Sequence, residues 1–245
     1  MPWLKICPFS VVVFIGTAAA FVLHEQRKIQ RSSTALKAIP TTDVVSFPSC
    51  NVVFVLVAPG VGKGTQCQLI CERLTTPTRW VHLSAGDLLR AERNKAQSEL
   101  GDEINACIAA GQLVRSEITC QLLENAMRSA YAKDKTTHFL IDGYPRSQSN
   151  MDVWVETMQQ HTMTAVLDFV CPEETLIGRL LERGKSSGRV DDNLATVQKR
   201  FDTFRRETAP ILEWFRTSSS IPVHTIPTDK PVEDVYKDTV TYLTS

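Results

Sequence analysis

The sequence predicts an α/β domain whose parallel sheet is covered by helices on both faces. The run from Val52 to Val57 is continuously apolar and rich in β-branched residues, which is typical of a strand buried on both sides. Further apolar strand candidates alternate with helical stretches along the chain, and this alternation is the pattern of a parallel sheet. A glycine-rich loop joins the first strand to the first helix.

The elements expected after that first strand follow in regular order. Strands are expected at residues 80–83, 138–141, 165–170 and 223–226. Helices are expected at residues 64–74, 87–94, 117–130, 147–159, 173–183, 194–215 and 232–243. Because strand and helix alternate without a visible internal repeat, we assign residues 49–245 to a single domain.

Residues 1–48 differ from this domain and are predicted to be a hydrophobic anchor or targeting segment followed by a linker. Residues 8–23 carry no charge, and as a helix they would span about 24 Å, which is marginal for a hydrocarbon core of about 30 Å. Basic residues flank this stretch, with Lys5 before it and Arg27, Lys28 and Arg31 after it. That excess of positive charge favours a signal anchor whose C-terminal side faces the cytosol.

Two alternatives stay open for this N-terminal segment. Glu25 is the only acidic residue among the first forty, which suits a mitochondrial presequence. The small residues at positions 17–20 suit cleavage by a signal peptidase. The expected location is therefore cytosol-facing with an anchor at residues 8–23, and mitochondrial targeting and cleavage are the alternatives.

Charge and cysteine content exclude several classes of partner and site. The 27 lysines and arginines balance 27 aspartates and glutamates, so the chain has no net positive charge. A nucleic-acid partner is therefore not expected. The chain has 7 cysteines and no C-x-x-C pair, so we expect free thiols and neither a disulfide framework nor a structural zinc site. Any anion site must therefore be built locally from clustered basic side chains.

The loop after the first strand has the composition of a phosphate-binding site. Its glycines let the backbone approach a phosphate closely, and the helix that follows directs its amide groups at the same point. Lys63 adds a positive charge there, and Thr65 supplies a hydroxyl for phosphate or a magnesium-bound water. The residues that we expect to bind phosphate are Pro59, Gly60, Val61, Gly62, Lys63, Gly64 and Thr65. The general G-x-x-x-x-G-K-[ST] pattern is broken at two positions, because Val57 and Gly64 replace the usual Gly and Ser or Thr.

Four ordered motifs resemble the adenylate kinase family, and within it the UMP/CMP kinases. The loop from Gly60 to Gln66 is the first, and residues 82–90, 142–146 and 182–193 resemble the first nucleotide-site motif, the signature motif and the lid. The resemblance covers about residues 51–245. It implies the P-loop nucleoside monophosphate kinase fold, a five-stranded parallel sheet flanked by helices, with a nucleotide-binding segment at about 84–114 and a short lid at about 183–193. Because the family is mostly monomeric, the resemblance also implies a monomer.

The same resemblance implies an activity and a role for each basic residue. It implies phosphoryl transfer from ATP, with Mg²⁺, to a nucleoside monophosphate, and the catalytic residues would be Lys63, Arg146, Arg183, Arg189 and Arg200. Arg183 and Lys230 would join the loop in binding ATP. The acceptor would contact Ser84, Ala85, Gly86, Arg90, Gln112, Val114, Gly143, Arg146, Asn150, Arg189 and Arg200. Asp142 ends an apolar strand where an open sheet binds its ligand, and it would hold magnesium through water.

Two positions favour a pyrimidine acceptor. Asn150 and Ala85 match the residues of UMP/CMP kinases, and a carboxamide pairs with either cytosine or uracil, so UMP and CMP are expected, with dCMP as a further candidate. An adenylate kinase that uses AMP stays an alternative, because adenine also presents a donor beside an acceptor.

Two departures from the family pattern bear on activity. Val57 and Ala58 replace two usual loop glycines, which suggests a membrane-attached nucleotide-binding protein with little turnover as a second alternative. We favour activity, because a valine that ends the first strand has a negative φ and is not strained. Arg115 stands where the family usually has proline beside the base pocket, and it either changes base preference or faces water.

Overall fold

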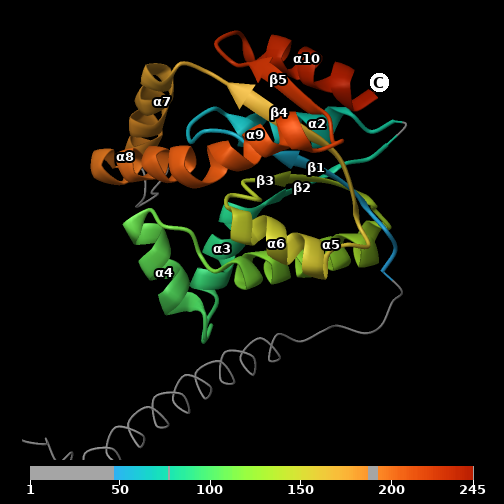
Figure 1. The fold of residues 1–245 in the computed structure, drawn as a ribbon, viewed down its shortest axis with the longest axis horizontal. Helices are drawn as coiled ribbons and strands as arrows, with labels where there is room; N and C mark the ends of the chain where they lie inside the picture. Colours follow the sequence, from blue (N-terminus) through green and yellow to red (C-terminus); the bar gives the residue numbers. More distant parts are fainter. Residues whose placement is uncertain (1–46, 77, 187–192, 245) are drawn as a thin grey trace, which may run out of the picture. The chain divides into compact units, whose positions relative to one another are not determined.

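The computed structural model describes residues 47–76, 78–186 and 193–244, and a five-stranded sheet forms its centre (Figure 1). The strand order is β2-β3-β1-β4-β5, with β1 at Asn51–Val55, β2 at Val81–Ser84, β3 at His138–Asp142, β4 at Thr162–Val170 and β5 at Val223–Pro227. Every neighbouring pair is parallel. The predicted α/β fold with a parallel sheet is confirmed.

β1 lies at the centre of the sheet because its residues are apolar on both sides. Val52 and Phe54 pack into one hydrophobic core, and Val53 and Val55 pack into the other, on the opposite face. The register sets Val55 beside Asp142 of β3. The carboxyl ends of the central strands therefore lie together, which is where an open parallel sheet binds its ligand.

The helices cover both faces of the sheet, and Figure 1 shows α5 and α6 on one side and α10 on the other. α5 (Ser116–Asp134), α6 (Gln148–Thr157) and α9 (Ala209–Ser218) pack against the core that contains Phe54. α2 (Lys63–Arg73), α7 (Glu173–Ser186), α8 (Leu194–Thr203) and α10 (Val232–Thr244) pack against the core that contains Val53. α3 (Ala85–Asn94) and α4 (Gly101–Ala110) follow β2 and share a smaller apolar cluster that contains Ile104.

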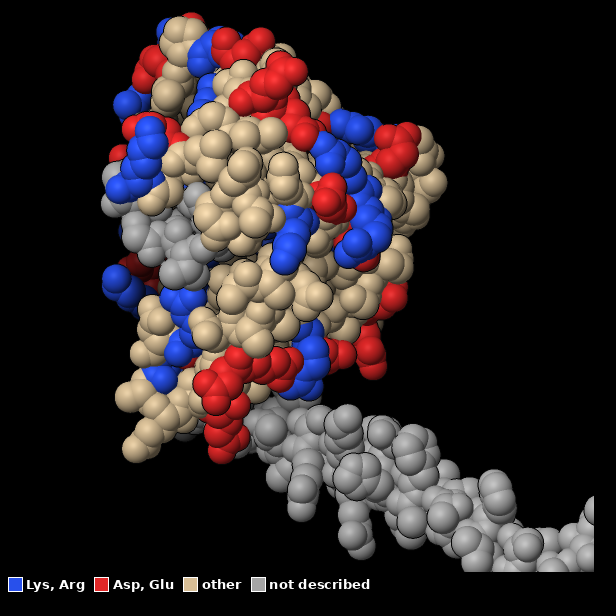
Figure 2. All heavy atoms as spheres, turned by 90° about the vertical axis from the view of Figure 1, so that its left-hand side faces the viewer, with Lys and Arg blue, Asp and Glu red and all other residues tan. Residues whose placement is uncertain are grey.

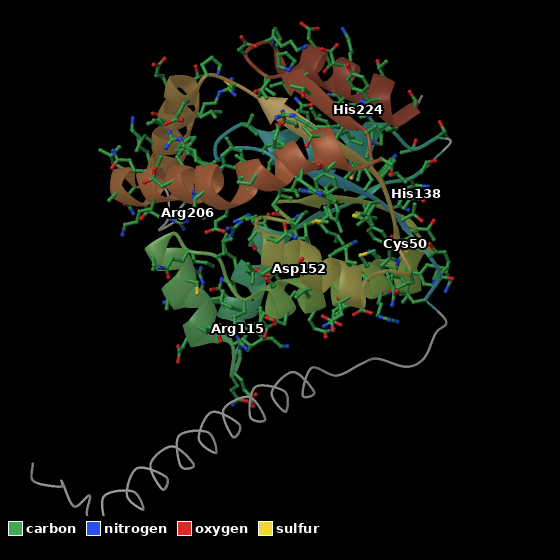
Figure 3. The ribbon with its side chains drawn as sticks, viewed as in Figure 1. Cys50, Arg115, His138, Asp152, Arg206 and His224 are labelled. Atoms are coloured by element: carbon green, nitrogen blue, oxygen red, sulfur yellow. The ribbon has the colours of Figure 1, made fainter. Side chains whose placement is uncertain are left out.

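α4 is the helix that the sequence patterns did not predict. Ile104, Cys107 and Ile108 have helical spacing and join one small apolar cluster, but the helix has only 10 residues and Leu100 at its N-terminal cap makes no side-chain capping bond. The signals that mark it are the acidic first turn, which includes Glu103, and Gly111 at its C-terminal cap. Arg115, just before α5, bonds to Glu103 of this helix (Figure 3). Because α4 contacts α3 and α8, it forms one wall of the pocket described below.

The sequence predicts one helix over residues 194–215, and the structure divides this stretch. A π turn, η1 at Phe204–Thr208, separates α8 from α9, and the N–H of Ala209 donates to the carbonyl of Phe204. Pro210 follows in the first turn of α9, and its nitrogen has no hydrogen to donate to the preceding turn. The run therefore stays helical but gains one residue in its middle turn.

Charged side chains of both signs are interspersed on the face that carries α4, α7 and α8 (Figure 2). In the part of the chain that the structure describes, no helix is both long enough and apolar enough to cross a membrane. The predicted anchor or targeting sequence at residues 8–23 lies outside the described residues and stays a prediction. Most of the predicted lid also lies outside them, because residues 187–192 are not described.

Candidate active site

A pocket opens at the carboxyl ends of β1 and β3, between α3, α4 and the helical run from α8 to α9. Its lining contains many of the residues that the sequence singled out, namely Pro59, Lys63, Ala85, Gly86, Arg90, Gln112, Val114, Gly143, Arg146, Asn150 and Arg200. These residues come from stretches far apart in the chain. The structure thus brings the loop that carries Lys63 and most of the predicted acceptor residues to one cavity.

The loop between β1 and α2 is shaped by two glycines with positive φ. Gly60 has a φ of 89°, and Gly62, at the N-terminal cap of α2, has a φ of 90°. A Cβ atom on Gly60 would lie 2.8 Å from the carbonyl oxygen of Leu176, so a larger residue there would displace α7. The amide end of α2 follows this tight turn at once, a geometry suited to binding an anion.

Val57 is not the last residue of the first strand, as the sequence predicted, because β1 ends at Val55. The consequence drawn from that prediction still holds. Among the described residues that are not glycine, only Gln97 and Lys135 have a positive φ, so neither Val57 nor Ala58 is strained. Both side chains pack against the core on the α2 face, and the two replacements therefore leave the loop undistorted.

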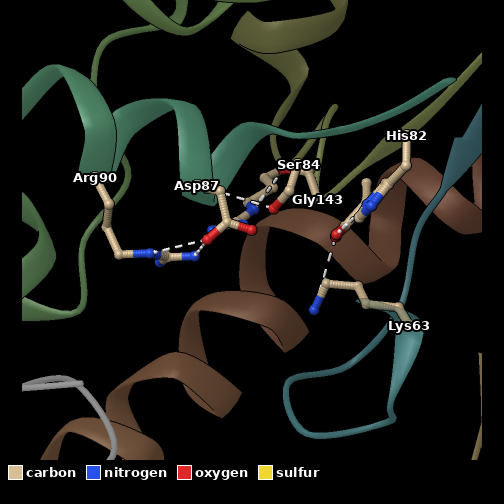
Figure 4. Close-up of polar contacts among 8 residues, drawn as sticks. Lys63, His82, Ser84, Asp87, Arg90 and Gly143 are labelled. Atoms are coloured by element: carbon tan, nitrogen blue, oxygen red, sulfur yellow. Dashed lines mark hydrogen bonds and ion pairs between the residues drawn. The ribbon is translucent and has the colours of Figure 1, made fainter. Parts of the chain in front are cut away.

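Three ionisable side chains meet at the carboxyl ends of the central strands (Figure 4). Asp142 is buried, and its Oδ2 accepts a hydrogen bond from Nε2 of His82 at 3.0 Å. Nζ of Lys63 lies 3.9 Å from the other carboxylate oxygen, Oδ1. That oxygen is buried and accepts no hydrogen bond from any described residue. His82 belongs to the motif at residues 82–90, but no role was predicted for it from the sequence.

The charges of this group act on one another. Burial alone would raise the pKa of Asp142, but Lys63 and the hydrogen bond from His82 lower it below its usual value, so the carboxylate is ionised at neutral pH. Burial lowers the pKa of Lys63, Asp142 raises it, and three nearby arginines lower it further: Arg146, Arg200 and Arg183. An ionised carboxylate with one unsatisfied oxygen suits a water ligand of magnesium, so Asp142 fits the ion that the resemblance implies.

The loop after β3 fixes Arg146 at several atoms. Nε of Arg146 donates to the carbonyl oxygen of Gly143 at 2.6 Å, and its backbone N–H donates to Oδ1 of Asn150 at 2.9 Å. Gly143 has a φ of 71°, and a Cβ atom there would lie 2.5 Å from the guanidinium group. Glycine therefore lets the Arg146 side chain fold back along the pocket wall.

Asn150 is buried, and both ends of its carboxamide are bonded. Oδ1 accepts from the N–H of Arg146, and Nδ2 donates to Oγ of Ser116 at 2.8 Å. Because a backbone N–H is only a donor, flipping the carboxamide would lose the first of these bonds. Oγ of Ser116 also lies 2.8 Å from Oγ of Ser149. The sequence predicted Asn150 as a base-binding residue but predicted neither Ser116 nor the fixed orientation.

Arg90 lines the pocket beside Ala85 and Gly86 of α3. Its guanidinium group pairs with Asp87 at 2.5 Å (Figure 4). Oγ of Ser84 accepts from the N–H of Asp87 at 3.4 Å and caps α3. Ser84 thus orients the helix that carries Arg90, while its predicted contact with the acceptor stays a prediction.

The remaining predicted residues lie at different places. Arg200 of α8 lines the pocket, and Arg183 near the end of α7 lies close enough to lower the pKa of Lys63. The side chain of Lys230 pairs with Asp238 of α10, and its predicted backbone contact with ATP is untested. Arg189 lies outside the described residues.

Arg115 has no place in the pocket lining. Its Nε and NH2 groups donate to the carboxylate of Glu103 at 2.6 and 2.9 Å, and 42% of its side chain is exposed. The preceding residue, Val114, lines the pocket instead. The structure therefore favours the interpretation in which Arg115 faces water.

The helical run from α8 to α9 supplies pocket residues that no pattern predicted. Thr203, Phe204 and Thr208 all line the cavity together with Arg200. The sequence from 194 to 215 has the pattern of an ordinary amphipathic helix, so no local signal marks these three side chains.

Comparison with known proteins agrees with this architecture. A family model described as adenylate kinase matches residues 55–220. Uridylate kinase from Saccharomyces cerevisiae is 46% identical over 188 residues, which cover 77% of this chain and 88% of that protein. UMP-CMP kinases from Danio rerio and Homo sapiens are 44% and 42% identical, and in each case the match covers 77% of this chain and 94% of the relative. The chain belongs to the adenylate kinase family.

Proposed function

We propose that this protein transfers the γ-phosphoryl group of ATP to UMP and CMP. The observation that carries the proposal is the convergence of two phosphate-binding arrangements at one pocket, with the Lys63 loop on one side and Arg90 and Arg146 on the other. The relatives named uridylate kinase and UMP-CMP kinase support the choice of acceptor.

The loop before α2 binds the donor phosphates. Its backbone amides and the amide end of α2 face the phosphate oxygens, and Lys63 adds a positive charge beside them. Val57 and Ala58 leave this loop unstrained, which supports a working donor site. Asp142 would hold Mg²⁺ through water, and the ion would supply further positive charge to the donor phosphates.

Arg146 and Arg90 hold the acceptor phosphate with planar, permanently charged donor groups. The bonds from Arg146 to Gly143 and Asn150 set its position before the acceptor arrives. An oxygen of the acceptor phosphate attacks the γ-phosphorus, and the bond to the leaving ADP oxygen breaks. Because the attacking oxygen is already anionic, catalysis depends on positioning and charge neutralisation, to which Lys63 and Arg200 contribute.

Each end of the Asn150 carboxamide makes one internal bond and keeps one further hydrogen-bonding position. Oδ1 accepts a second bond and Nδ2 donates a second bond, and both of these go to the base. Adenine also presents a donor beside an acceptor, so hydrogen bonding alone does not reject AMP. The pocket walls, which include Leu89 and Val114, limit the size of the base. Discrimination by size of this kind amounts to about 10–200-fold, and we expect that preference for UMP and CMP over AMP.

The test is a coupled assay of ADP formation from ATP with UMP, CMP, dCMP or AMP as acceptor. UMP and CMP are expected to give the highest kcat/KM, and omission of the acceptor is the background control. Omission of Mg²⁺ is expected to abolish turnover. Absence of ADP with every acceptor would refute the enzymatic proposal, and faster turnover with AMP would refute the pyrimidine assignment.

A further inference from the structure

The helical run from α8 to α9 contributes four side chains to one pocket. Arg200, Thr203, Phe204 and Thr208 all line the cavity, although they span more than two turns of helix. Their spacing is 3, 1 and 4 residues, so Thr208 comes eight residues after Arg200. In a regular α-helix a residue eight positions on lies at the edge of the face that the first one begins, and a residue seven positions on lies closest to the first in direction.

The π turn brings Thr208 closer to the direction of Arg200. An α-helix advances about 100° per residue, so eight residues would carry Thr208 about 80° past the direction of Arg200. A π turn holds one more residue than an α turn and removes about 100° of this advance, which leaves the two side chains within about 20°. The bond from the N–H of Ala209 to the carbonyl of Phe204 is the bond that defines this wider turn. Arg206, in the same turn, lies on the exposed side (Figure 3).

The hydroxyl of Thr208 is directed at the acceptor side of the pocket. It donates to the carbonyl oxygen of Arg146 at 2.9 Å, and the residue is only 5% exposed. Thr208 comes just before α9 within this continuous helical run, with helical φ and ψ of −90° and −38°, and its side chain makes no capping hydrogen bond. Its hydroxyl therefore bonds outside its own helix, to the loop after β3.

This contact completes the bonding of the Arg146 backbone. The N–H donates to Asn150, the carbonyl accepts from Thr208, and Nε of the side chain donates to Gly143. Without the hydroxyl, the carbonyl would lose this partner beside a buried side chain and would shift to find another. A shift of the carbonyl would move the backbone from which the guanidinium group projects.

We infer that Thr208 is a positioning residue that holds Arg146 in register with Arg200 for the acceptor phosphate. The π turn makes this arrangement, because it lets one helical run present Arg200 and then the hydroxyl that fixes Arg146. The inference rests on the proposed function in one respect, since it names the acceptor phosphate as the group that the two arginines bind.

The experiment compares Thr208→Val with Thr208→Ser in the full-length protein. Valine keeps the size and branching but removes the hydroxyl, so KM for UMP and CMP is expected to rise about tenfold. KM for ATP is expected to change by less than about twofold, because the hydrogen bond of Thr208 goes to Arg146 and not to the loop before α2. Serine keeps the hydroxyl and is expected to restore KM for the acceptor to within about threefold of the parent.

A matched control separates positioning from stability. Thr239 is also a buried threonine whose hydroxyl bonds a backbone carbonyl, but that carbonyl belongs to Val235 of its own helix, α10. Thr239→Val is expected to lower the thermal midpoint while leaving both KM values unchanged. Thr208→Ala replaces the valine variant if the latter does not fold.

A second measurement does not depend on catalysis. Amide hydrogen exchange over residues 143–150 is expected to accelerate in Thr208→Val and to stay at the parent rate in Thr208→Ser and Thr239→Val. Unchanged exchange, or faster exchange with an unchanged acceptor KM, would overturn the inference. If the parent protein phosphorylates no acceptor, the proposed function fails, and the exchange result then decides the role of Thr208 by itself.

Discussion

The phosphate loop and the acceptor pocket meet at Lys63, yet the chain builds them in opposite ways. The loop is one short stretch between β1 and α2, and its shape depends on neighbouring residues such as Gly60 and Gly62. The acceptor pocket is assembled from α3, α4, the loop after β3 and the run from α8 to α9. A site made from one stretch is visible as a motif, whereas an assembled site depends on contacts that exist only in the folded chain.

The largest expected effect comes from Lys63→Ala, which tests the loop. Loss of a charge aimed at the donor phosphates is expected to lower kcat by about a hundredfold to a thousandfold. The fold should persist, because 23% of the Lys63 side chain is exposed and its removal leaves no cavity in the core. Steady-state kinetics and the thermal midpoint measure the two outcomes.

Lys237→Ala, at an exposed position of α10, is the matched control. Near-normal turnover in Lys63→Ala would show that this loop is not catalytic.

A smaller effect is expected from Asp142→Asn, which tests the point where the two regions meet. The substitution keeps the shape but removes the charge that faces Lys63 and suits a magnesium-bound water, so kcat is expected to fall about tenfold to a hundredfold. The Mg²⁺ concentration for half-maximal activity is expected to rise, and a magnesium titration of the rate measures it. Asp152→Asn, on the exposed face of α6, is the control. An unchanged magnesium requirement would remove Asp142 from its proposed role.

The smallest effect is expected from Arg115→Ala, which tests where the assembled pocket ends. Arg115 is paired with Glu103 outside the lining, so kcat/KM for each acceptor is expected to change by less than about twofold. The loss of stability should stay below about 1 kcal/mol, as for other exposed ion pairs. Rates with UMP, CMP and AMP, together with thermal midpoints, check both statements, and Glu103→Ala should behave alike. A change in the order of acceptors would place Arg115 in base recognition.

The same contrast separates what the sequence predicted from what it did not. The parallel sheet, most helices and the loop residues around Lys63 follow from periodicity and local composition, which adjacent residues determine. α4 was missed because it is short and Leu100 at its start gives no capping signal. The bond from Asn150 to Ser116 joins residues on α6 and α5 that are 34 positions apart. The contact of Thr208 with Arg146 spans 62 positions and depends on a π turn. Neither has a local signature.

The cluster of positive charges around Lys63 has a consequence for proton uptake. Burial lowers the pKa of Lys63 most, Arg146, Arg200 and Arg183 lower it further, and Asp142 opposes them. Nucleotide phosphates add several negative charges to the same volume, and opposite charges raise the pKa of an ammonium group. Substrate binding therefore favours the protonated form of Lys63 and is linked to proton uptake at alkaline pH. In that range the heat of binding would depend on the ionisation enthalpy of the buffer, so the electrostatic coupling of the site becomes measurable as a proton count.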